Sequence, residues 1–201
     1  DNSLTQEAIH ASDGRVWIIE DDDSLHALKH LRAELVSPKL ANADLEALKN
    51  VVAAIAASGA HINPHCGIHV HIGAKDATVE EINRVIDVMI DEEHMLVKTF
   101  NCSQRRLQKF ARLISQGFIR KFRRCRPKTP EDLEKLWYGR PANPQRRSDR
   151  YHKSRYRGLN LQSYFYRGTV EFRYFDGSLD QKRIEAYIKC CLDIANKAGL
   201  P

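Results

Sequence analysis

The 201-residue sequence predicts an α+β domain built around an antiparallel sheet, with helices packed on one face of that sheet. Two segments, at residues 66–73 and 169–175, alternate in polarity with the period of a half-buried strand. Two others, at residues 82–97 and 184–194, space their apolar residues with helical period. Strands and helices do not alternate as βαβ units, so we expect one domain with an antiparallel sheet over residues 1–201.

The individual elements follow from local signals. Pro38 ends one extended stretch, because a residue before proline is disfavoured in the helical region. Ser58-Gly59 ends the first helix, and Thr78 with Glu81 forms a capping box that begins the longest one. We expect strands at about residues 15–20, 29–36, 66–73 and 169–175, and helices at about 42–57, 78–97, 104–114, 130–136 and 180–197.

Charge is distributed unevenly along the chain. The segment Arg105–Arg157 holds 18 Lys/Arg against 4 Asp/Glu, a local net charge of +14, while the remaining residues carry a net charge of −8. We call the region from about residue 101 to 157 the basic insert. Its four prolines predict short helices and mobile loops, which could supply a lid. An acidic body with a basic insert suits a metal and anion site, and it also suits nucleic-acid binding.

Other features limit the class of protein. The five cysteines are odd in number, and Cys190-Cys191 are adjacent, so the chain has no secreted disulfide pattern. No apolar run reaches the ~20 residues that span a bilayer, and no signal peptide is visible. We therefore expect a cytoplasmic protein without a membrane partner.

His69 and His71 project from the same face of one expected strand, roughly 7 Å apart at two residues' rise. Two imidazoles at this spacing can reach one metal ion or one group of phosphate oxygens. The alternative is a solvent-facing strand that carries two histidines by chance. The nearby His61, His65 and Cys66 raise the possibility of structural zinc, but their spacing fits no standard zinc pattern.

Glu171 and Arg173 repeat this geometry on another expected strand, with Phe172 on the opposite face. A carboxylate can hold Mg²⁺ while the neighbouring guanidinium contacts the phosphate that the metal bridges. The alternative is a surface ion pair, which contributes little. Glu34 lies in a third expected strand, either as a ligand or on the polar face of an edge strand.

Six segments of the chain form an ordered set: Asp23-Ser24, Glu34-Leu35-Val36-Ser37-Pro38, Cys66-Gly67-Ile68-His69-Val70-His71, Leu159-Asn160-Leu161, Gly168-Thr169-Val170-Glu171-Phe172-Arg173-Tyr174-Phe175 and Gly177-Ser178-Leu179-Asp180. Together they resemble the amidoligase family, which is related to glutamine synthetases and glutamate–cysteine ligases. The resemblance covers about Val16 to Lys197. It implies a glutamine-synthetase-like catalytic fold, in which an antiparallel sheet cups ATP and Mg²⁺ or Mn²⁺.

The resemblance also implies a reaction and roles for particular residues. ATP would phosphorylate a small-molecule or peptide carboxylate, and an amine would then displace phosphate from the acyl phosphate. His69 and Glu171 would bind metal, with Glu34 as a further ligand on an earlier strand. His71 would contact the nucleotide, and Arg173 would hold the transferring phosphate.

Arg155 and Arg157 lie closest in sequence to the Asn160 segment, so we expect these three residues to contact the nucleotide. Family members usually begin with a strand carrying two acidic residues as E-x-E. No such strand is evident before Trp17, and Glu7 stands alone in a polar stretch. We expect that strand either to be missing here or to be degenerate, with weakened metal binding.

Two rival functions use the same residues. A nucleic-acid-binding module would employ the basic insert, where Trp137, Tyr138, Tyr151 and Tyr156 lie among arginines as a single-strand binder requires. The histidine and Glu/Arg strands would then have no function, and no known binding motif appears. A metal-dependent hydrolase would share the ligands, but no compact set such as H-E-x-x-H is present.

Overall fold

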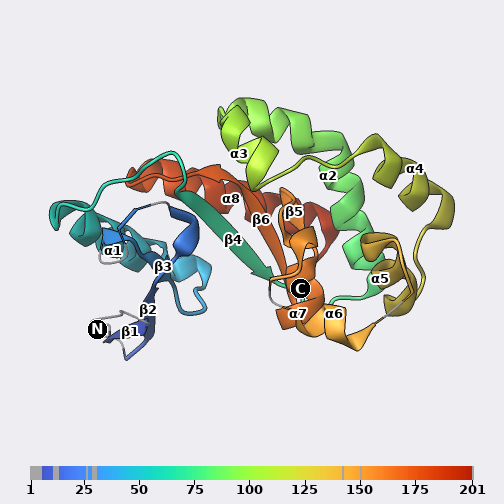
Figure 1. Ribbon diagram of the computed structural model, residues 1–201, viewed down its shortest axis with the longest axis horizontal. Coiled ribbons are helices and arrows are strands. Elements are labelled where there is room, and N and C mark those ends of the chain that lie inside the picture. The colour runs from blue at the N-terminus through green and yellow to red at the C-terminus, as the bar shows by residue number, and fades with distance from the viewer. Residues whose placement is uncertain are drawn as a thin grey trace. The chain divides into compact units, whose positions relative to one another are not determined.

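The computed structural model describes residues 6–10, 14–25, 27–28, 31–141, 143–149 and 151–200 (Figure 1). The chain divides into two compact units. The N-terminal unit comprises residues 1–66 and 177–182, and the main unit comprises residues 67–176 and 183–201. Each unit contains one three-stranded antiparallel sheet, so the predicted α+β class is confirmed. Instead of the one sheet that was expected, the described residues form two.

The N-terminal unit contains the sheet β1-β2-β3 and one long helix. Its elements are β1 (Gln6–His10), β2 (Val16–Glu20), the 3₁₀ turn η1 (Asp23–Leu25), β3 (Glu34–Val36), the 3₁₀ turn η3 (Asn42–Asp44) and α1 (Leu45–Ala57). The predicted strand at 15–20 and the predicted helix are confirmed, and Ser58 is the C-cap that ends α1. Residues 29 and 30 of the expected strand at 29–36 lie outside the described residues, and among 31–36 the last three residues pair with β2.

The main unit is built on the sheet β4-β6-β5, with bounds β4 (Gly67–Gly73), β5 (Leu159–Asn160) and β6 (Thr169–Asp176). Its principal helices are α2 (Val79–Thr99), α7 (Gln162–Arg167) and α8 (Gln181–Ala198). The capping box at Thr78 is present, since its hydroxyl accepts from Glu81 N and the Glu81 carboxylate accepts from Thr78 N. The two alternating strands and the two longest helices are therefore confirmed.

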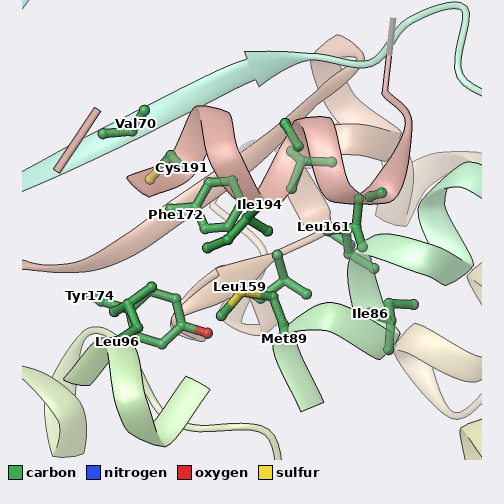
Figure 2. Close-up of a cluster of buried hydrophobic side chains, with 14 of the residues drawn as sticks. Val70, Ile86, Met89, Leu96, Leu159, Leu161, Phe172, Tyr174, Cys191 and Ile194 are labelled. Atoms are coloured by element: carbon green, nitrogen blue, oxygen red, sulfur yellow. The ribbon is translucent and has the colours of Figure 1, made fainter. Parts of the chain in front are cut away.

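One face of this sheet is covered by the apolar sides of α2 and α8 (Figure 2). Phe172 of β6 lies beside Met89 of α2 and Ile194 of α8, and all three are almost completely buried. Val70 of β4 joins the same cluster. Because strand residues alternate between faces, the neighbours of Val70 and Phe172 in sequence point to the other face. That other face carries the candidate site.

A β-bulge interrupts the strict alternation of β6. The register with β4 shifts between Ile68 and Val70, so that Arg173 and Tyr174 together oppose one residue of β4. Because of the extra residue, the consecutive residues Tyr174 and Phe175 are both fully buried in the core. Strict alternation would have placed Phe175 on the same face as Glu171.

The basic insert is largely helical and contributes to the core of the main unit. Its elements are α3 (Gln104–Lys109), α4 (Gln116–Cys125), α5 (Pro130–Tyr138), α6 (Pro144–Ser148) and the 3₁₀ turn η4 (Lys153–Arg155). The predicted helix at 130–136 is confirmed, whereas the one at 104–114 ends at Lys109 and α4 was not predicted. Phe122, Leu133 and Trp137 are buried, so a hydrophobic cluster fixes much of this charged segment.

None of the helices in the described part of the chain is long and apolar enough to cross a membrane. All five cysteines are free thiols.

Candidate active site

Four predicted site residues lie together on the sheet face opposite α2 and α8. His71 of β4 is the direct cross-strand partner of Glu171 of β6. His69 Nδ1 lies 3.5 Å from Glu171 Oε1, and His71 Nε2 lies 3.6 Å from the same oxygen. Arg173 Nη1 is 2.5 Å from Oε1 as well. Two strands far apart in sequence thus bring two imidazoles and a guanidinium onto one carboxylate oxygen.

The second oxygen of Glu171 is held by Asn160 of β5, whose Nδ2 donates to Oε2 over 2.5 Å. Asn160 is itself fixed, because its Oδ1 accepts from the backbone N of Gln162 at 2.8 Å. Glu171 and Asn160 are only 4% and 2% exposed, so water competes little with these contacts. The structure thus places Asn160 against the site carboxylate, and its expected contact with the nucleotide stays a prediction.

Glu171 is ionised in this setting at neutral pH. Burial is the largest single influence and raises the pKa of this carboxyl group, but the charges of Arg173 and His71 and the hydrogen bonds from Asn160 and Arg173 together outweigh it. The net result is a pKa of Glu171 below its ordinary value.

Both histidines are neutral at neutral pH. Burial lowers the pKa of His69 well below its usual value, and Arg173 and Arg106 lower it further. Burial also lowers the pKa of His71, although Glu171 opposes this shift. His71 Nδ1 lies 2.9 Å from the Thr169 hydroxyl, which fixes the ring and leaves Nε2 facing Glu171.

The donor types at this place fit a divalent metal ion. A metal requires neutral imidazole and ionised carboxylate, which are the states found at His69, His71 and Glu171. Among the described residues, however, no group of three or more His, Cys, Asp or Glu side chains is arranged to hold a metal. Metal binding therefore stays a prediction.

Arg106 of α3 is a site residue that sequence reasoning missed. Its Nε donates to the backbone oxygen of Arg173 at 2.8 Å, and the side chain is only 2% exposed. Its guanidinium occupies the space of a missing side chain, since a Cβ added at Gly67 would lie 1.9 Å from Nη1. In sequence Arg106 is one of many cations in the basic insert. The only available signal was Gly67, the first residue of the G-x-H-V-H motif.

Two buried N–H groups near this site lack a hydrogen-bond partner: Arg106 Nη2 and Arg173 Nε. Buried donors of this kind are rare, and a bound anion or water usually explains them. Burial, together with Arg173, lowers the pKa of Arg106 to about 10, so it still carries its charge at neutral pH. The place therefore combines positive charge with unused donors, which is the chemistry of an anion site.

The two other predicted nucleotide contacts lie in different environments. Arg155 is close enough to lower the pKa of both His69 and His71, and its guanidinium also stacks over Tyr151 at 5.5 Å. Arg157 stacks on Trp137 at 4.2 Å from the ring centroid. Burial lowers the pKa of Arg157, with a further contribution from Arg112. Arg155 thus acts electrostatically on the site, whereas Arg157 contacts the aromatic cluster of the basic insert.

Glu34 lies in β3 of the N-terminal unit, so its expected role as a metal ligand stays a prediction. Within that unit it is the direct cross-strand partner of Glu20, which places two carboxylates side by side. A strand that had not been predicted, β1, precedes Trp17 and pairs with β2. Glu7 is the one acidic residue of β1, so the E-x-E pattern itself is absent from this strand.

The family assignment rests on a comparison with models of known protein families. The model described as "Putative amidoligase enzyme" matches residues 2–195, almost the whole chain. This match places the chain in an enzyme family of ligase type. The chain belongs to the amidoligase family. Comparisons with curated proteins and with solved structures found no match.

Proposed function

We propose that the protein is an ATP-dependent carboxylate–amine ligase, which forms an amide or peptide-type bond through an acyl phosphate. Membership of the amidoligase family supports the ligase class. The single observation that carries the proposal is the ion pair between Arg173 and Glu171, with both histidines within 3.6 Å of the shared oxygen. The nucleotide and the metal come from the family resemblance and from the donor chemistry of this cluster.

In this proposal His69 and Glu171 hold Mg²⁺ or Mn²⁺, and His71 lies beside them to contact the nucleotide. The metal supplies positive charge that neutralises the phosphate oxygens of ATP. Thr169 and Ser163 orient the His71 ring by their hydroxyls, at 2.9 and 3.2 Å from Nδ1. Because burial keeps both imidazoles neutral, protons compete little for their nitrogen lone pairs at neutral pH.

Arg173 links the metal-binding carboxylate to the transferring phosphate. Its Nη1 contacts Glu171, while its buried Nε has no partner within the described structure. A guanidinium placed in this way can donate to a phosphoryl oxygen without releasing Glu171. Such preorganised donors stabilise the negative charge that is spread over the phosphoryl oxygens during transfer.

The reaction balances in two steps. A carboxylate oxygen of the acid substrate attacks the γ-phosphorus, and the bond to the β-phosphate bridging oxygen breaks to release ADP. The amine then attacks the carbonyl carbon of the acyl phosphate, loses a proton, and inorganic phosphate leaves with its electron pair. The chain's own contribution is to position the reactants and to screen their charge. It also limits the access of water to the largely buried carboxylate of Glu171.

The nucleic-acid alternative receives no support from the aromatic residues of the basic insert. Trp137 is buried, its Nε1 donates to Ser154, and Tyr138 and Tyr156 are partly buried. Tyr151, at 70% exposed, is the one of the four that is largely exposed to solvent, and the Arg155 guanidinium lies over its ring. The cations remain available to phosphate, but the stacking surface that single-strand binding requires is largely used in packing.

Trapping with hydroxylamine tests the proposal without knowledge of the natural amine. Hydroxylamine attacks an acyl phosphate to give a hydroxamate and phosphate, which a ferric-ion assay detects. We expect hydroxamate and ADP in equal amounts when the protein is incubated with Mg·ATP, hydroxylamine and a panel of amino acids and dicarboxylates. Glu171→Gln and Arg173→Ala should each lower the rate at least 100-fold, since removal of a transition-state donor typically costs 10²–10³.

Glu131→Gln is the matched control, because it removes a carboxylate charge from an exposed position of α5. It should leave the hydroxamate rate within twofold of wild type. Hydroxamate formation that persists in Glu171→Gln would remove this residue from the site. ADP release without hydroxamate for any acid would point to an ATPase rather than a ligase.

A further inference from the structure

We propose that Arg106, which lies against Gly67, forms an oxyanion subsite together with Arg173, and that this subsite takes one phosphoryl group. This inference rests on the proposed function only for the source of the group, the terminal phosphate of ATP. Arg106 has no counterpart among the residues that the sequence pattern assigned to the site. Its inclusion changes the phosphate contact from one guanidinium to two.

The two guanidinium-bearing residues are held in a fixed relation. Arg106 Nε donates to the backbone oxygen of Arg173 at 2.8 Å. The helix that carries Arg106 is also anchored, because the Asp176 carboxylate accepts from Ser103 N at 2.7 Å and from Ser103 Oγ at 2.6 Å. Ser103 in turn is the N-cap of α3 and accepts from Arg106 N. The donors are therefore preorganised.

Gly67 makes room for this arrangement. The guanidinium of Arg106 lies where the side chain of residue 67 would be, with Cζ and Nη2 both 2.1 Å from an added Cβ. The obstruction involves the planar head group, which is held by a buried hydrogen bond, rather than a freely moving end. Glycine at this position is thus required for Arg106 to lie against β4 beside His69.

The unused hydrogen-bond donors at this place call for an acceptor. Two guanidiniums, each at most 4% exposed, lie near one carboxylate, Glu171, which already pairs with Arg173. Asp176 also attracts Arg106, so two guanidiniums and two carboxylates balance in charge, and both Asp176 oxygens accept from Ser103. Each arginine retains one buried N–H without a partner, at Arg106 Nη2 and Arg173 Nε. A phosphoryl group, with several acceptor oxygens and up to two negative charges, can use donors from two different directions, whereas a planar carboxylate suits a single fork.

The test measures binding of inorganic phosphate and of tripolyphosphate by calorimetry, in EDTA so that no metal contributes. Acetate serves as the carboxylate probe. We expect the wild type to bind tripolyphosphate and phosphate more tightly than acetate. Arg106→Lys keeps the charge but removes the planar fork, and it should weaken both phosphate ligands at least tenfold. Arg124→Lys, at an exposed position of α4, is the matched control and should bind as the wild type does.

Gly67→Ala provides a second, independent variant. A methyl group there displaces the Arg106 guanidinium while the arginine stays in the chain, so phosphate binding should again fall at least tenfold. A thermal melt of each variant without ligand shows whether it is folded. If Gly67→Ala does not fold, Arg106→Lys decides the question alone.

The outcomes separate this inference from the proposed function. Phosphate binding that is within twofold of wild type in Arg106→Lys overturns the subsite, as does a wild type that binds acetate more tightly or binds no phosphate. Mg·ATP binding that survives in Arg106→Lys leaves the ligase proposal standing while the subsite fails. If phosphate binding depends on Arg106 but the protein does not bind Mg·ATP, the subsite is supported and the ligase proposal is contradicted.

Discussion

Asn160 donates a hydrogen bond from Nδ2 to Glu171 Oε2 over 2.5 Å, and both side chains are almost completely buried. The contact is one link in a longer chain. Gln162 N donates to Asn160 Oδ1, and Gln162 Nε2 donates at 2.9 Å each to the backbone oxygens of Arg146 and Asp149 in the basic insert. The carboxylate at the centre of the site is thereby connected to the insert through two amide side chains.

Asn160→Ala should destabilise the protein by about 1–3 kcal/mol, because it leaves a buried charged oxygen of Glu171 without its partner. Urea unfolding measures this loss. The hydroxamate rate should also fall, since Glu171 becomes free to rotate. Asn196→Ala, at an exposed position of α8, should change neither quantity. Equal stability of the Asn160→Ala and Asn196→Ala proteins would show that the hydrogen bond is not formed in solution.

Trp137→Ala should cost about 3–5 kcal/mol, as expected for truncation of a buried tryptophan. It removes the hydrogen bond to Ser154 and the ring under Arg157. The many arginines of the basic insert should then become more sensitive to trypsin, and the rate of cleavage measures this. Tyr151→Ala removes an exposed aromatic residue from the same insert and should leave cleavage unchanged. If both variants are cleaved at the wild-type rate, the insert is not held by its hydrophobic cluster.

Thr78→Ala should lower stability by about 1 kcal/mol, because the Thr78 hydroxyl caps the first turn of α2 by accepting from Glu81 N at 3.2 Å. A urea titration suffices to measure it. Thr99→Ala, at the other end of the same helix and exposed, should have a smaller effect. The response to ligands should be unchanged in both variants, so a lost response in Thr78→Ala would mean that the start of α2 contributes to the site.

Glu93 should make the stability depend on pH. Its carboxylate accepts from Tyr174 at 2.7 Å and from Ile114 N at 2.9 Å, yet burial raises its pKa above the ordinary 4.5. The folded state therefore holds this proton more tightly than the unfolded state. The corresponding contribution to stability is complete below pH 4.5 and is lost as pH rises through the folded pKa.

Unfolding in urea between pH 4 and pH 7 measures this contribution as the difference between wild type and Glu93→Gln. The wild type should lose stability relative to the variant as pH rises through that interval. Glu131→Gln, which removes an exposed carboxylate, should instead follow the wild-type curve. Parallel curves for wild type and Glu93→Gln would contradict the raised pKa.

The two strands that carry the site were predictable because polar and apolar residues alternate along them with the two-residue period of a strand. His69, His71, Glu171 and Arg173 occupy alternate positions, and burial of the opposite face fixes which way they point. The bulge at Arg173 was not predictable, since it inserts one residue without a glycine or any other sequence mark.

Other features escaped prediction because they depend on contacts between distant segments. Arg106 differs from its neighbours in the basic insert only through its burial against Gly67, which no local pattern reveals. The helix α4 was missed because Phe118 and Phe122 are surrounded by cations, so its apolar stripe is narrow. Glu34 lies in a separate sheet because β3 pairs with β2. Amino-acid composition does not show which strand another strand will pair with.

The most direct measurement of the central claim compares the melting temperature of wild type and Glu171→Gln with and without millimolar Mg·ATP. A ligand at 100 times its dissociation constant stabilises the native state by about 2.7 kcal/mol. The melting temperature of the wild type should therefore rise by several degrees. Most of that rise should be lost in Glu171→Gln, some of it in Arg173→Ala and none in Glu131→Gln. An unchanged wild-type melting curve, or an equal rise in Glu171→Gln, would contradict a nucleotide and metal site at Glu171.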